Sequence, residues 1–149
     1  MGQSLTPISV TGSTFTLDRH VHREGVGVLN RAAGVTVTLP AASGTGERYG
    51  LLVGTTVSSN STVIQVANAS DTMVGHIATG LTTGAAGADF GEAIGGTDDT
   101  ITMNGTTTGG VKGSYVEVQD VATNLWLVNG ALVGSRTLAT SISAAVSQA

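Results

Sequence analysis

The sequence predicts an all-β protein, namely a compact antiparallel β-sandwich or barrel of about nine short strands with extended arms at both termini. Gly, Ser and Thr together supply 58 of the 149 residues, a composition that favours strands and turns over helices. The chain is 40% hydrophobic with a net charge of only −4, which argues against intrinsic disorder. Short runs of alternating apolar and polar residues recur about every 8–12 positions, the spacing typical of sandwiches and barrels.

The first strands follow a polar terminal segment. Residues 1–14 are irregular and contain a proline, so we expect an extended arm. The first strand signal is at residues 15–17, and it leads into the charged run 18–24, which we interpret as extended. Residues 35–39 alternate with a period of two until Pro40 ends the run. Their apolar side chains should therefore face the core.

The middle of the chain continues the strand pattern, which then becomes weaker. Residues 76–97 are rich in glycine, and we interpret them as a long excursion or as weak edge strands around residues 89–90. The strands predicted before this excursion are residues 48–54, 63–67 and 71–75.

Two Asn-Gly pairs, at residues 104–105 and 129–130, are favoured turns for two-residue hairpins. We therefore expect a hairpin at each. The β domain is predicted to span residues 15–134, and the Ser- and Ala-rich residues 135–149 are expected to form a tail. The strands predicted in this part are residues 100–103, 115–121, 124–128 and 131–134.

Composition also excludes several functional classes. The chain has no cysteine, and its six Lys and Arg residues face ten Asp and Glu residues. Disulfide and thiolate chemistry are therefore excluded, and we expect no nucleic-acid partner. No basic segment precedes an apolar run at the N-terminus, and no apolar stretch approaches 18 residues. We accordingly expect neither a signal peptide nor a membrane partner.

The strongest polar cluster is Asp18, His20, His22 and Glu24. On an extended strand these alternate residues would share one face, and two histidines with a carboxylate could ligate a metal. The third histidine, His76, stands alone, so no further histidine or cysteine cluster in the sequence completes the coordination shell of a metal. We favour the interpretation that these four residues form a solvated or inter-subunit face. His20 and His22 stay a weak candidate for a metal site, which would need a ring of histidines around a trimer axis.

The sequence contains no set of residues in a pattern known from catalytic sites. The Gly-x-Ser-x-Gly pattern of a nucleophile elbow is missing. Asp98 and Asp99 are adjacent, so they would face opposite sides of a strand rather than one bond. Residues 44–48 resemble a phosphate loop only faintly, because the Lys-Ser/Thr ending is missing. We therefore predict that the chain is not an enzyme and binds no cofactor.

Five stretches of the chain carry a resemblance to a known family, namely residues 28–46, 58–62, 66–75, 101–110 and 126–130. Together they resemble the decoration, or cement, proteins of tailed bacteriophages. Members of that family sit on the outside of icosahedral heads, usually as trimers. The resemblance extends over roughly residues 20–135.

The resemblance implies a structural virion protein, made in the bacterial host cytoplasm, that binds the major capsid protein on the outer surface of the head and stabilises the capsid. It also implies a homotrimer. For the trimer contact we name His20, His22 and Trp126, although core burial is the default expectation for Trp126. For the capsid contact, composition and position point to five residues of the N-terminal arm: Gln3, Leu5, Pro7, Ile8 and Val10.

Two other functions stay open at this point. Residues 38–46 are also similar to segments of phage tail-fibre and tailspike proteins. The chain could therefore be a tail-fibre or receptor-binding module whose Ser, Thr and Asn loops recognise host surface glycans. A small hydrolase or lectin is the least favoured of these functions, because no group of residues in the sequence indicates a single catalytic or binding site.

Overall fold

The computed structural model describes residues 6–82, 88–93 and 96–146, and these form a two-layered β-sandwich without helices. The larger sheet contains, in spatial order, β1 (Ile8–Val10), β3 (Val26–Leu29), β5 (Arg48–Val53), β10 (Tyr115–Ala122), β11 (Leu125–Gly134), β7 (Thr72–Leu81) and β8 (Ala88–Ala93). The smaller sheet contains β12 (Ile142–Ser143), β9 (Thr100–Met103), β6 (Thr62–Gln65), β4 (Thr36–Thr38) and β2 (Thr14–Thr16). The predicted all-β class is confirmed, and the described residues form twelve strands in place of about nine.

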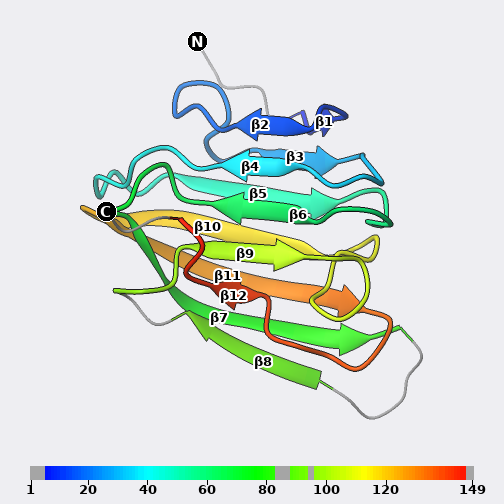
Figure 1. Cartoon of the computed structure of the whole chain (residues 1–149). Coiled ribbons are helices and arrows are strands. Elements are labelled where there is room, and N and C mark those ends of the chain that lie inside the picture. Colours follow the sequence, from blue (N-terminus) through cyan, green and yellow to red (C-terminus); the bar gives the residue numbers. More distant parts are fainter. Residues whose placement is uncertain (1–5, 83–87, 94–95, 147–149) are drawn as a thin grey trace.

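The first six strands alternate between the two sheets, so the chain winds around the sandwich (Figure 1). Each turn adds one strand to each sheet, and β1, β3 and β5 are therefore parallel, as are β2, β4 and β6. Parallel neighbours need a long crossover, and here a strand of the opposite sheet provides it. The sheets are consequently mixed, which corrects the expectation of a purely antiparallel sandwich.

The core lies between the sheets and is built from alternate strand residues. Val35, Val37 and Leu39 are all buried, as their alternation predicts. Trp126 is completely buried and packs at 6.0 Å between ring centroids against Tyr49 of β5. The core expectation for Trp126 is thus confirmed, and its assignment to an oligomer interface is corrected, because no atom of its side chain reaches the surface of the chain.

The second predicted hairpin is wrong. β11 runs without interruption through Asn129 and Gly130, because it pairs in parallel with β7 over its whole length. β7 likewise continues past Gly75 to Leu81 and pairs with β8 from Gly75 to Gly80. Most of the described residues of the predicted excursion are therefore regular sheet. The edge strand expected around residues 89–90 is present as β8.

The first Asn-Gly pair does form a turn, but not a two-residue hairpin. The turn begins the connection, residues 104–114, between β9 in one sheet and β10 in the other. The side-chain oxygen of Asn104 accepts hydrogen bonds from the backbone N–H groups of Thr106 and Thr107, both at 2.9 Å. Local side-chain bonding of this kind stabilises a turn without requiring the flanking strands to pair.

Both predicted arms contain ordered strands where the structure describes them. β1 lies within residues 1–14 and buries Val10, while β12 lies within residues 135–149 and buries Ile142. Residues 18–24, in contrast, form turns instead of the expected strand: the backbone N–H groups of Val21 and His22 both bond to the carbonyl oxygen of Asp18. No helix in the described part of the chain is long and apolar enough to cross a membrane.

Candidate interaction surface

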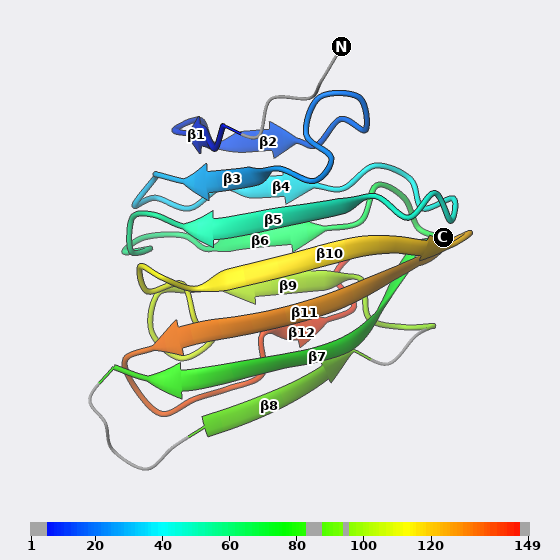
Figure 2. The ribbon, with the colours of Figure 1, turned by 180° about the vertical axis from the view of Figure 1, so that it is seen from behind.

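Among the described residues each sheet ends in an edge strand on both sides: β1 and β2 at one end of the sandwich, and β8 and β12 at the other. β1 is the outermost strand of the larger sheet and β2 of the smaller sheet, and they lie close together near the N-terminus in both views (Figures 1 and 2). At the opposite end, Gly91 of β8 lies beside Ile142 of β12, which helps to close the space between the sheets. We call the end formed by β1, β2 and the turn 18–24 the N-terminal end.

Exposed apolar side chains gather at the N-terminal end. Ile8 is 37% exposed and Val21 59% exposed, and they lie beside the half-buried Phe15. The space between these side chains is only about 10 Å³, at the lower limit of what one water molecule needs. The space between these described side chains is therefore too small to hold a small-molecule ligand.

The turn 18–24 brings its two histidines into different surroundings. His22 packs edge-on against Phe15, with ring centroids 5.0 Å apart, and its Nδ1 accepts a hydrogen bond from the backbone N–H of Asp18 at 2.8 Å. His20 is exposed. The shared strand face on which the metal candidate depended is not formed, and the described residues contain no group of three or more metal-ligating side chains.

A charged network holds this turn against the body of the sandwich. Nη1 of Arg19 lies 2.5 Å from Oε2 of Glu47 and 2.9 Å from Oδ2 of Asp120 on β10. The side chain of Asp120 is fully buried and also accepts hydrogen bonds from the backbone N–H groups of Ser43 and Gly44, at 3.0 and 2.6 Å. The network therefore joins the turn, the loop before β5 and β10.

The same network shifts the pKa of its buried carboxyl group. Burial alone would raise the pKa of Asp120, but the backbone N–H groups of Ser43 and Gly44, together with Arg19 and Thr45, stabilise the carboxylate more strongly. The pKa of Asp120 is consequently held below its ordinary value. Sequence reasoning missed this residue, because its partners are 75 to 101 positions away and no local pattern marks them.

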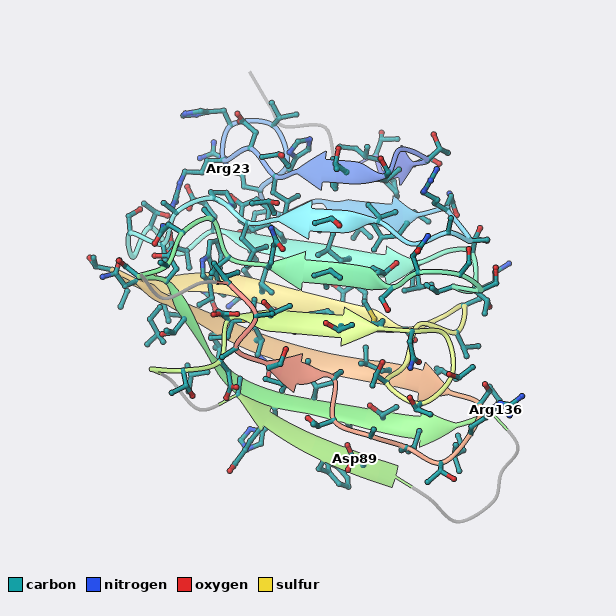
Figure 3. All side chains as sticks on the ribbon, in the orientation of Figure 1. Arg23, Asp89 and Arg136 are labelled. Carbon is teal, nitrogen blue, oxygen red and sulfur yellow. The ribbon has the colours of Figure 1, made fainter. Side chains whose placement is uncertain are left out.

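The predicted capsid contacts divide into three groups. Gln3 and Leu5 lie outside the described residues. Pro7 and Ile8 are exposed at the N-terminal end. Val10 is buried in the core, which corrects its assignment as a surface contact. Figure 3 places Arg23 at the N-terminal end, and Asp89 and Arg136 toward the opposite end.

No protein-family model, curated protein or solved structure matches this chain.

Proposed function

We propose that this chain is a non-enzymatic decoration protein that binds the outer surface of a phage head and stabilises the capsid. The observation that carries this proposal is the N-terminal end, where the outer edges of β1 and β2, unpaired among the described residues, adjoin the exposed side chains of Ile8 and Val21. Unpaired edges can accept an added strand from a partner, and neighbouring apolar side chains supply buried area.

The proposed partner is the major capsid protein, which repeats many times on a shell. Each contact through one small end would be weak, but a trimer would engage several capsid subunits at once, so that the binding free energies combine. His20 is exposed on the turn 18–24 and stays a predicted trimer contact. The mass of the purified chain in solution, measured by light scattering, tests the trimer.

The test of attachment is the location of the chain on intact particles. Antibodies against the purified chain should label the heads of virions from the source phage in electron micrographs. Virions lacking the chain should lose capsid stability on heating yet still adsorb to host cells. Labelling of tail tips only, or loss of adsorption with unchanged heat resistance, would favour the tail-fibre function instead.

The N-terminal end can be tested on virions lacking the chain. Replacing Val21 by Asp, together with Ile8→Asp, should lower binding of the added chain at least tenfold, because charges would have to be buried against the shell. The matched control is Phe90→Asp, since Phe90 is 75% exposed on β8 at the opposite end. Attachment through this end would be contradicted if Phe90→Asp reduced binding and the double variant did not.

A further inference from the structure

We propose that a polar hollow on the outer face of the larger sheet binds a single neutral sugar ring, such as the terminal hexose of a polysaccharide. The hollow measures about 120 Å³ and opens between the turn before β3 and the strands β5 and β10. Its polar walls are Glu24, Arg48, Tyr115 and Glu117. The inference does not rest on capsid attachment. The hollow adjoins the N-terminal end through Glu24, but its other polar walls lie on β5 and β10.

Strand register places these side chains together on the solvent side of the sheet. Tyr49 and Val118 are directly paired and point into the core, so their neighbours Arg48 and Glu117 point outward. Gly50 pairs with Glu117 and forms the floor of the hollow. A Cβ atom at Gly50 would lie 2.5 Å from the hydroxyl of Tyr115, so only glycine lets that tyrosine lie across β5.

The backbone conformation and the hydrogen bonds of Glu24 hold it at the rim of the hollow. Its φ of 60° lies in the left-handed region, which is uncommon for a residue other than Gly, Asn or Asp. Its N–H donates to the carbonyl oxygen of Arg48 at 2.6 Å, and its Oε1 accepts from the N–H of Arg48 at 3.1 Å. The carboxylate of Glu24 is therefore positioned before any ligand arrives, which lowers the entropy cost of binding.

The hollow combines hydrogen-bond donors and acceptors of opposite charge. In the described structure Arg48 forms no ion pair with Glu24 or Glu117, the two carboxylates beside it. A small cation would be opposed by the guanidinium, and a small anion by the carboxylates. Hydroxyl groups both donate and accept, so a neutral polyol satisfies all three groups, while the ring of Tyr115 offers an apolar surface for the C–H side of a sugar.

The size of the hollow limits the ligand. About 120 Å³ accommodates several water molecules, which suits one sugar ring and not an extended oligosaccharide. A ligand with so few contacts binds weakly, with a Kd on the order of 1 mM. The test therefore needs a method that detects weak binding.

We would test the site by saturation-transfer NMR on the full chain with glucose, galactose, mannose and N-acetylglucosamine. At least one of these sugars should receive saturation, and its titration should shift the backbone amide signals of Gly50 and Glu117 while that of Gly80 stays unchanged. Glu117→Ala and Arg48→Ala should each weaken binding at least tenfold, because each removes charge-assisted hydrogen bonds.

The matched control is Glu92→Ala. Glu92 is exposed on the outer face of the same sheet, but on β8, away from the hollow. This variant should bind as the wild type does, and thermal unfolding should show that all variants remain folded. Absence of saturation transfer to all four sugars would overturn the proposal, as would unchanged affinity in both Glu117→Ala and Arg48→Ala.

Discussion

Tyr49 places a hydroxyl group in the core, where it has no hydrogen-bond partner in the described structure. Burial, reinforced by the negative charge of Glu47, raises its pKa to about 12. An unpaired buried hydroxyl costs roughly 1–3 kcal/mol of desolvation. Tyr49→Phe keeps the ring packing against Trp126, so we expect the free energy of unfolding to stay the same or rise by about 1 kcal/mol.

Urea unfolding measures this change, and Tyr115→Phe is the control. Its hydroxyl lies on the half-exposed outer face, where removal should change stability by less than about 0.5 kcal/mol. A clear loss of stability in Tyr49→Phe would show that the hydroxyl does find a partner.

Asp120 makes stability depend on pH at the acid end. Because its pKa in the folded chain lies below the ordinary value of 3.8, the carboxylate stabilises the fold fully above that value. The contribution is lost as pH falls through the folded pKa. At pH 7 Asp120→Asn should therefore lower the free energy of unfolding by roughly 1–3 kcal/mol, since it removes charge-assisted hydrogen bonds.

Urea unfolding at pH 7, 5 and 3 measures this dependence. The difference between wild type and Asp120→Asn should be similar at pH 7 and 5 and smaller at pH 3. Asp89→Asn, on the edge strand β8, removes the same charge without this network and should have little effect. A difference that stays constant down to pH 3 would contradict the assigned role of the carboxylate.

At the scale of the element, Gly75 lets β7 and β11 pair along their full length. Its φ is +136°, and a Cβ atom there would lie 2.0 Å from the carbonyl oxygen of Val128 on the neighbouring strand. Gly75→Ala must separate these strands locally, so we expect a loss of roughly 1–3 kcal/mol. Calorimetric or urea unfolding measures it.

Gly80 supplies the control within the same strand. Nothing lies within 4 Å of a Cβ atom built there, and alanine suits a strand slightly better than glycine. Gly80→Ala should therefore leave stability unchanged or raise it by about 0.5 kcal/mol. Equal losses at the two positions would mean that the close approach at Gly75 is not what limits substitution.

Strands were predictable where burial alone selects alternate residues. The run 35–39 shows this, since Val35, Val37 and Leu39 are buried as expected. Prediction failed where a distant partner overrides a local signal: Asn129 and Gly130 have turn propensity, yet pairing with β7 keeps β11 extended. It failed also at residues 18–24, because alternation of polar residues carries no hydrophobic signal to define a face.

At the scale of the whole molecule, the winding of β1 to β6 around the sandwich decides which strands lie at the N-terminal end. The winding leaves β1 and β2 as edges at the N-terminal end and brings Arg19 against Asp120, 101 positions away. The capsid contacts named from the sequence separate accordingly: Ile8 is exposed on this surface and Val10 is buried beneath it. Because Ile8 and Val10 are two residues apart on β1, they share one face of the strand. Alternation therefore does not make this division, and their different burial follows from their different positions along the strand.

The sequence by itself determined the all-β class, the low charge and the buried side of the run 35–39, because composition and two-residue periodicity are local properties of the chain. Only the tertiary structure decided the parallel pairing, the buried network around Asp120 and the hollow between Glu24 and Glu117. These features join residues from separate strands, and their geometry depends on strand order and register, which no local pattern encodes.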